Sequence, residues 1–449
     1  MKHLRILALL AASFVIRMAS FGAEPCPHVL FILADDLGYG DLGCYGVPDI
    51  RTPRLDSMAA QGMRFTDAYA NGPTCSPTRY AFMTGRYQQR GGLESALYYQ
   101  EKNAGLPSGG ETLPRLLQGA GWQTALIGKW HLGYDPERTP NTQGFQHFFG
   151  LLGGNHHYFR HMDRLGHHDL FLNDRPVQRE GYSTDLFTED AIRFLRRRHD
   201  RPFFVFLSHP APHFPYQGPG DGDRPVEPKS PSWQSGTRSN YVSMVEHLDR
   251  SVGRVLDELD RLDLAARTLV VFTSDNGADP MGRNLPLSGL KGTLAEGGIR
   301  VPCIARWPGV IPAGKSIATP IVTMDWTATF LTLARVTPSE RLDGVDLLPM
   351  LRGEADSPGA RTLFWRRVPE PVRRKVVPQR ALRSGSWKYL EEQNCEPRLF
   401  DLARDVAEQQ DLAPEHPELC AEFCRQLDAW EAAMPASNPP FASFTKAKP

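Results

Sequence analysis

The chain has 449 residues, of which 41% are hydrophobic and 23% are charged, a composition typical of a globular protein with room for two or three domains. Lys and Arg together number 51, as do Asp and Glu, so the formal net charge is zero. A nucleic acid partner is therefore not expected, and any selectivity for an anion must come from a local cluster of basic side chains.

Residues 1–23 have the pattern of a secretory signal peptide. A basic start precedes the apolar run 6–16, and small residues follow up to Ala23. The run is too short to cross a bilayer and Arg17 ends it, so a stable membrane anchor is the less favoured alternative. We predict an exported protein, periplasmic or secreted.

The chain has seven cysteines, an odd number that in an exported protein indicates one special thiol. The sequence does not decide which of the other six form pairs and which stay free and buried.

Apolar runs typical of buried strands alternate with amphipathic helical patterns along most of the chain. Strands are predicted at residues 28–33, 124–127, 203–207 and 268–272, and helices at 53–61, from Thr112, at 184–197 and at 241–262. This alternation predicts an α/β fold with a large, mostly parallel mixed sheet flanked by helices. Residues 215–236 are rich in Pro, Gly and Ser and are predicted to form a long surface loop or lid.

The pattern changes after residue 355. Short strands predicted at 362–365, 387–390 and 398–400 are followed by a helix from Pro417 to about Ala433. These elements predict a smaller C-terminal α+β subdomain. The expected organisation is a signal peptide at 1–23, a main domain at 24–355 and the C-terminal subdomain at 356–449.

Polar side chains follow four of the predicted strands, soon after each strand ends. They are Asp35 and Asp36 after the first strand, Lys129 and His131 after the second, His209 and His213 after the third, and Asp275 and Asn276 after the fourth. A single Asp after a strand is more often a turn residue or a helix cap. Because the carboxyl ends of parallel strands border the ligand site of an open α/β sheet, the joint pattern predicts one site.

The acidic and amide side chains of this set favour a hard cation. Asp35, Asp36, Asp275 and Asn276 all offer oxygen, and no set of Cys and His has the spacing of a zinc site. With oxygens from a nucleophile and a substrate the ligand count reaches about six or more, which favours calcium over magnesium. The basic residues expected beside this cation, together with two histidines, are Arg79, Lys129 and Lys291. A dication among such residues suits a tetrahedral oxyanion ester.

The segment from residue 75 to residue 86 reads Cys-Ser-Pro-Thr-Arg-Tyr-Ala-Phe-Met-Thr-Gly-Arg. Its Cys-x-Pro-x-Arg pattern followed by Thr-Gly-Arg resembles the signature of the type I sulfatases, which have an alkaline phosphatase-like fold. Further segments that resemble motifs of this family are 34–41, 128–133, 211–215, 274–277, 291–300 and 399–413. The resemblance covers essentially the whole mature chain, and Thr78 stands where the family most often has Ser.

The resemblance implies hydrolysis of sulfate esters with a formylglycine, which a maturation enzyme makes by oxidising Cys75. It also implies a calcium site whose ligands, besides an oxygen of the modified Cys75, are Asp35, Asp36, Asp275 and Asn276. Pro77 suits the first turn of a helix, which places Cys75 near a helix N-terminus, where an anion is favoured.

The resemblance assigns roles to the basic residues as well. Arg79 supports the formylglycine hydroxyl and the metal carboxylates, and Lys129 and Lys291 bind sulfate oxygens. His131 is the base for the elimination step, and His213, with or without help from Lys291, is the acid for the leaving alcohol.

The physical reason for such a nucleophile is that a sulfated serine would be about as hard to cleave as the substrate. A hydrated aldehyde has two hydroxyl groups. One attacks sulfur to form a covalent sulfoenzyme intermediate, and loss of the proton from the other expels sulfate as the carbonyl forms again. A metal ion can acidify the attacking hydroxyl.

Other histidines leave alternatives open. His209 precedes His213 by four residues and is an alternative for the acid. A second group, His156 to His168, is expected to form a loop or a substrate subsite rather than a second metal site.

A sulfated carbohydrate is the predicted substrate. The segments 91–108, 152–182 and 215–238 carry Tyr, Trp, His and Arg side chains that suit a sugar. The basic runs 196–198 and 373–375 are expected to be solvated faces rather than grips for a polyanion. The alternatives are a phosphonate or phosphate ester hydrolase on the same scaffold and an inactive protein that binds sulfated glycans.

Overall fold

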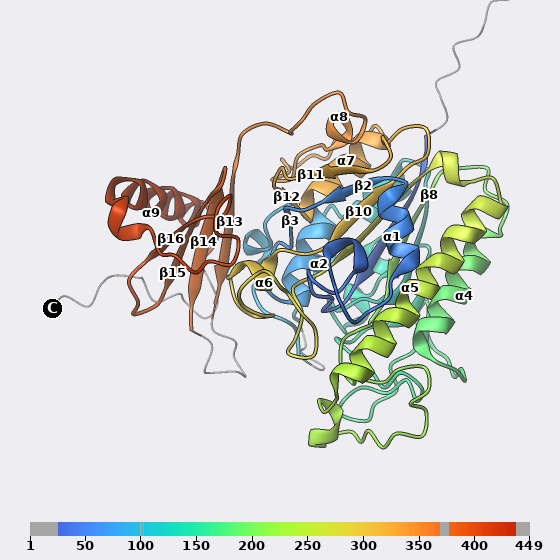
Figure 1. Cartoon of the computed structure of the whole chain (residues 1–449). Helices are drawn as coiled ribbons and strands as arrows, with labels where there is room; N and C mark the ends of the chain where they lie inside the picture. The colour runs from blue at the N-terminus through green and yellow to red at the C-terminus, as the bar shows by residue number, and fades with distance from the viewer. Residues whose placement is uncertain (1–25, 99–100, 102, 369–376, 437–449) are drawn as a thin grey trace, which may run out of the picture.

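The computed structural model describes residues 26–98, 101, 103–368 and 377–436. The predicted signal peptide and the basic run 373–375 lie outside these residues. Figure 1 shows two sheets that lie apart: a large one in the body of the molecule and a small one packed beside a C-terminal helix.

The large sheet is built from short, mostly apolar strands. In chain order they are β1 (His28–Ala34), β2 (Met63–Phe65), β4 (Gln123–Lys129), β5 (His147–Leu151), β6 (Phe171–Leu172), β7 (Arg175–Pro176), β8 (Phe203–Ser208), β9 (Thr268–Ser274), β10 (Cys303–Arg306) and β11 (Lys315–Ile317). Their order in the sheet is β11-β2-β10-β9-β1-β8-β4-β5-β6-β7. The central strands from β9 to β5 run parallel, whereas β10, β6 and β7 pair antiparallel. The predicted large, mostly parallel mixed sheet is confirmed.

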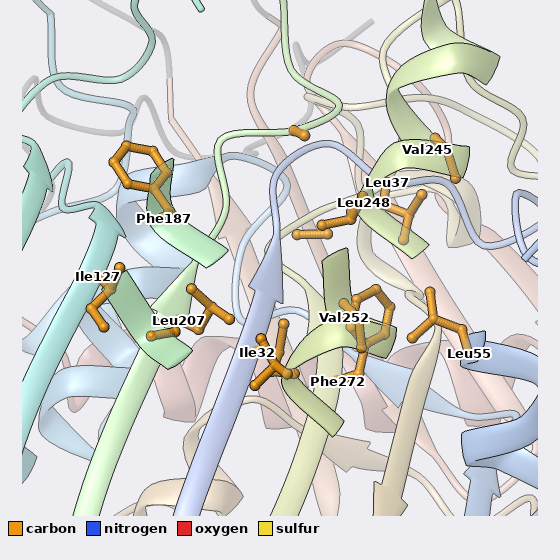
Figure 2. Packing of buried hydrophobic residues seen from close by; sticks show 14 of the residues in the cluster. Ile32, Leu37, Leu55, Ile127, Phe187, Leu207, Val245, Leu248, Val252 and Phe272 are labelled. Atoms are coloured by element: carbon orange, nitrogen blue, oxygen red, sulfur yellow. The ribbon is translucent and has the colours of Figure 1, made fainter. Parts of the chain in front are cut away.

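Helices cover both faces of this sheet. They are α1 (Pro53–Ala60), α2 (Cys75–Thr84), α3 (Leu113–Gly119), α4 (Ser183–Leu195), α5 (Arg238–Arg261), α6 (Glu296–Ile299), α7 (Met324–Leu333) and α8 (Leu348–Leu351). Ile32 of β1 packs with Leu55 of α1 and Val252 of α5 (Figure 2). Its neighbour Phe31 points to the other face and stacks on Phe82 of α2, with ring centroids 4.1 Å apart. Full burial of each such side chain contributes about 1.5–3 kcal/mol, so both faces stabilise the sheet.

The small sheet is antiparallel throughout. Its strands, in spatial order, are β13 (Thr362–Arg367), β14 (Gln379–Ser384), β15 (Trp387–Glu392) and β16 (Arg398–Asp401). The helix α9 (Pro417–Ala432) packs on it through Phe423 and Leu427. A third sheet has two strands and pairs β3 (Ala68–Tyr69) with β12 (Ile321–Val322). The predicted small C-terminal α+β unit is therefore present.

All seven cysteines are described, and each is a free thiol. In the part of the chain that the structure describes, no helix is both long enough and apolar enough to span a bilayer.

Candidate active site

The sheet order places β9, β1, β8 and β4 side by side, and all four run in the same direction. These are the four strands that the sequence predicts to end at polar residues. Their carboxyl ends bring the predicted side chains together with Cys75, the first residue of α2. Asp35, Asp36, Cys75 and His213 offer ligand atoms that all lie within 4.8 Å of one another, and no other such group occurs among the described residues.

Asn276 completes the oxygen-rich side of the site. Its Nδ2 donates to Asp36 Oδ1 at 2.7 Å and to Gly277 O at 2.9 Å, whereas its buried Oδ1 has no hydrogen-bond partner among the described residues. Asp36 N donates to Asp275 Oδ1 at 3.3 Å. Asp36 has a φ of +63°, a left-handed conformation that few non-glycine residues adopt. The fold thus holds three carboxylates and an unpaired amide oxygen in the donor set that calcium or magnesium prefers.

The electrostatics of the carboxyl groups fit a bound cation. Burial alone would raise the pKa of Asp36, but the ammonium group of Lys291 and its other basic neighbours lower it to about 2. Burial and the adjacent carboxylate of Asp35 raise the pKa of Asp275 to about 6. Carboxylates packed so closely resist joint ionisation, and a divalent ion between them would remove that repulsion.

Cys75 begins α2 and points at this acidic group. Its Sγ lies 3.4 Å from Asp35 Oδ1, and the residue is 2% exposed. Burial raises the pKa of its thiol well above the usual range, so an unmodified Cys75 stays protonated and is a poor nucleophile. Thr78 anchors the helix, because its Oγ1 accepts from Gly72 N at 3.0 Å and donates to Gly72 O at 3.1 Å. The hydroxyl makes these contacts, so Thr in place of the more common Ser preserves them.

Arg79 is fully buried and ties three strand ends together. Its Nε and Nη2 contact Asp275 Oδ2 at 3.0 and 2.9 Å. Its Nη1 donates to Lys129 O at 3.1 Å and to Ser208 Oγ at 2.6 Å. Ser208 was not predicted as a site residue, although a polar residue at the end of β8 is the same signal that identified the others.

Two lysines add to the positive charge that Arg79 brings to the site. Lys129 Nζ contacts Asp35 Oδ2, and Lys291 Nζ lies 2.6 Å from Asp36 Oδ2. The side chain of Lys129 is fully buried, and that of Lys291 is 13% exposed. Both ammonium groups therefore lie beside the acidic cluster, where an anionic ester would meet them.

The hydrogen bonds of His131 define its tautomer, in which Nδ1 is free to accept a proton. Its Nε2 lies 2.9 Å from the carbonyl oxygen of Leu97, which can only accept, so Nε2 carries the hydrogen. Its buried Nδ1 has no hydrogen-bond partner among the described residues. Burial and the nearby Lys129 lower the pKa of His131 well below its usual value, which keeps the ring neutral.

His213 and His209, the two candidates for the acid, lie in different surroundings. His213 Nδ1 lies 2.6 Å from the carbonyl oxygen of the next residue, and its Nε2 is 3.5 Å from Asp36 Oδ2. His209 is fully buried, and the titratable groups that act on it are His247 and Asp185, away from the acidic cluster. Only His213 of the two lies at the predicted site.

In the second histidine group His156, His157 and His161 are buried within their loop, whereas His167 is exposed. His156 contacts Asp169 O at 3.0 Å and Ser183 Oγ at 2.9 Å, so both its ring nitrogens are used. Trp233, expected to suit a sugar, is fully buried and donates to Asn155 Oδ1 at 2.8 Å. These side chains hold the loops together rather than lining an open subsite.

Two protein-family models together match residues 27–432 of the chain. Residues 27–336 match the family model described as Sulfatase, and residues 291–432 match the one described as N-sulphoglucosamine sulphohydrolase, C-terminal. The chain is similar to the N-acetylgalactosamine-6-sulfatase of Canis lupus familiaris, with 36% identity over 382 residues, which are 78% of this chain and 70% of the relative. It is similar to arylsulfatase A of Homo sapiens, with 34% identity over 396 residues, 81% of this chain and 74% of the relative.

A solved structure is similar over nearly the whole chain. It is the crystal structure of Ps i-CgsB in complex with k-i-k-neocarrahexaose, with a TM-score of 0.81 and 32% identity. The match covers 90% of this chain and 92% of that one.

Proposed function

The chain belongs to the sulfatase family of the alkaline phosphatase-like superfamily and is a sulfuric ester hydrolase; from this premise we propose that it removes sulfate from a sulfated carbohydrate with a formylglycine made from Cys75. The observation that carries the proposal is the position of Cys75 at the N-terminus of α2, 3.4 Å from Asp35 Oδ1. A nucleophile at position 75 would lie beside both the proposed cation site and the ammonium groups of Lys129 and Lys291.

The proposed cation is calcium, with magnesium less favoured. Its ligands would be an oxygen of the modified Cys75 together with Asp35, Asp36, Asp275 and Asn276. The unpaired Oδ1 of Asn276 and the raised pKa of Asp275 support this donor set. When bound, the ion supplies positive charge that acidifies a neighbouring hydroxyl group and attracts a sulfate ester.

The proposed formylglycine supplies two hydroxyl groups in its hydrated form, one to take the sulfuryl group and one to lose a proton as sulfate departs. Lys129 and Lys291 hold the sulfate oxygens, and Arg79 holds Asp275 in place. A maturation enzyme would oxidise Cys75 before or during export, which the pattern of residues 1–23 supports.

The two histidines divide the proton transfers. His131 removes the proton at its Nδ1, because its Nε2 is committed to Leu97. His213 Nδ1 carries a hydrogen because it faces the carbonyl oxygen of Phe214, so Nε2, the nitrogen that faces Asp36, gives a proton to the leaving alcohol only when the ring is protonated on both nitrogens. Burial lowers the pKa of His213 to about 3, so Lys291 beside the same carboxylate assists in protonating the alcohol.

The substrate class is supported by the relatives. One is named N-acetylgalactosamine-6-sulfatase, and a similar structure was solved with k-i-k-neocarrahexaose bound. A sulfated carbohydrate is therefore the proposed substrate.

Mass spectrometry and activity measurements together test the proposal. The tryptic peptide that contains Cys75 should carry an aldehyde in active enzyme, and Cys75→Ala should lower turnover by about four orders of magnitude or more while the fold is retained. A panel of sulfated saccharides, with aryl phosphate diesters as the competing class, should show preferred cleavage of a sulfated sugar. Full activity with an unmodified thiol would disprove the mechanism, and preferred cleavage of the phosphate diester would disprove the substrate class.

A further inference from the structure

The segment that carries Lys291 is fastened to the rest of the site by its backbone. This segment, residues 284–299, is called the Lys291 segment below. Lys291 N donates to Ala278 O at 3.0 Å, two residues after Asn276, and Gly292 N donates to Pro73 O at 2.8 Å, two residues before Cys75. A movement of the segment would therefore displace Lys291 relative to the nucleophile and to the acidic cluster.

The other side of the Lys291 segment is held by the C-terminal unit. Glu408, in the loop after β16, accepts with Oε2 from Ser288 Oγ and, at 2.7 Å, from Glu296 N. Gln379 of β14 accepts with Oε1 from Leu294 N at 3.0 Å. Figure 1 shows α6, at the end of this segment, between α2 and the strands of the small sheet.

A buried lysine completes this contact. Lys388 Nζ of β15 lies 2.8 Å from Glu296 Oε1 and 2.8 Å from Glu408 Oε1, and the side chains are 0%, 0% and 3% exposed. The charged residues that extend the cluster are Arg300, Arg383 and Asp67. Three positive and three negative groups then balance, as buried ions require. Glu408 has a φ of +55°, so its loop holds an uncommon conformation to make these contacts.

We propose that Glu408 and Lys388 are positioning residues that hold Lys291 in place for sulfate binding and departure of the alcohol, which makes the small C-terminal sheet part of the catalytic apparatus. The inference rests on the role proposed above for Lys291. Neither residue needs to touch substrate, because each acts through the backbone of the Lys291 segment. The charge balance of the cluster fixes that backbone more firmly than a set of neutral contacts would.

The test compares Glu408→Ala and Lys388→Met with wild type in the full-length, calcium-loaded and formylglycine-containing protein. We expect kcat/KM to fall about ten- to a hundredfold, because displacement of a charged group by about 1 Å has effects of that size. The loss should be larger for alkyl sulfates than for aryl sulfates with acidic leaving groups, since Lys291 assists the departing alcohol. The affinity for inorganic sulfate, measured by calorimetry, should fall as well.

A matched control separates positioning from stability. Arg361→Met breaks the ion pair between Arg361 and fully buried Asp325. This ion pair also joins the C-terminal part to the main domain, but it does not touch the Lys291 segment. It should lower the thermal midpoint and leave the leaving-group dependence unchanged. The double variant Lys388→Met/Glu408→Gln restores the charge balance and should recover activity relative to Lys388→Met alone.

The proposal is wrong if Glu408→Ala and Lys388→Met behave like Arg361→Met, with lower thermal midpoints but unchanged sulfate affinity and leaving-group dependence. If either variant does not fold, Ser288→Ala and Gln379→Ala each remove one contact and are subject to the same readouts. If the wild type cleaves no sulfate ester, the proposed function fails, and the comparison of sulfate affinities still decides the positioning role.

Discussion

His131 is held from two sides, and one of them is a glycine. Its Nε2 donates to Leu97 O at 2.9 Å, and its ring lies against Gly154, where a Cβ would be 2.7 Å from Nε2 and 2.8 Å from Cε1. The backbone of His131 has a φ of +58°, which few non-glycine residues adopt. These contacts hold the ring in a position that leaves Nδ1 free to accept a proton.

Gly154→Ala should lower kcat about ten- to a hundredfold with little loss of stability, because the added methyl group displaces the His131 ring from Leu97 O. Steady-state kinetics and the thermal midpoint measure the two effects. Gly222→Ala is the control, since its Cβ would only reach ordinary contact with Phe159 at 3.6 Å. A Gly154→Ala enzyme with wild-type kcat would show that the position of the His131 ring does not limit turnover.

The residues of the site could be predicted from the sequence where they follow a strand or lie inside a motif. Asp35, Asp275 and Lys129 each follow an apolar strand, and the structure brings them together at adjacent strands. Glu408 and Lys388 could not be found in this way. They lie more than ninety residues after Lys291 in the sequence, and only the tertiary contact between the small sheet and the main domain gives them a part near the site.

At the scale of elements, α2 depends on one hydroxyl group. Thr78 Oγ1 satisfies both the N–H and the C=O of buried Gly72, and these contacts fix the turn that leads to Cys75. Gly72 itself has little space, since a Cβ there would be 2.9 Å from Pro77 Cβ. The start of the helix is therefore set by local packing rather than by a side-chain N-cap, which Thr74 does not provide.

Thr78→Val should lower the free energy of unfolding by about 2–4 kcal/mol, because it leaves two buried backbone groups of Gly72 without partners. Activity should fall with it, since Cys75 follows the same turn. Chemical denaturation and turnover are the measurements. Thr78→Ser keeps the hydroxyl and should stay close to wild type, and a Thr78→Ser variant as unstable as Thr78→Val would show that the methyl group matters instead.

The elements predicted well are those with long apolar patterns. The strands β1, β4, β8 and β9 were each predicted to within two residues at either end, and α5 to within three, because burial on both faces or on one stripe leaves a clear pattern. β14 was missed, because its buried Arg380 and Arg383 break the apolar pattern. These arginines are buried with acidic partners such as Glu391 and Asp67, which only the folded chain supplies.

At the scale of the whole molecule, burial of histidines sets how stability depends on pH. The histidines whose pKa is lowered, in each case chiefly by burial, are His28, His131, His156, His157, His161, His199, His209 and His213. Below the unfolded value of about 6.5 the unfolded chain binds protons that the folded chain does not, so stability falls as the pH falls. The carboxyl groups whose pKa burial raises oppose this trend but are fewer among the described residues; they are Asp41, Asp169, Asp249, Asp275 and Asp346.

His209 offers the cleanest test, because it is fully buried, neither ring nitrogen has a hydrogen-bond partner among the described residues, and burial lowers its pKa to about 3. The contribution of the neutral His209 ring to the free energy of unfolding is complete above about pH 6.5 and is lost as the pH falls towards 3. Between pH 7 and pH 5 the wild type should therefore lose about 2 kcal/mol more unfolding free energy than His209→Leu. Denaturant unfolding at both pH values, followed by tryptophan fluorescence in saturating calcium, measures the difference.

Between pH 7 and pH 8 the two proteins should change in parallel, because His209 is neutral in both the folded and the unfolded state. Equal losses between pH 7 and pH 5 would mean that His209 accepts a proton in the folded protein, which its enclosed and unpartnered ring should prevent.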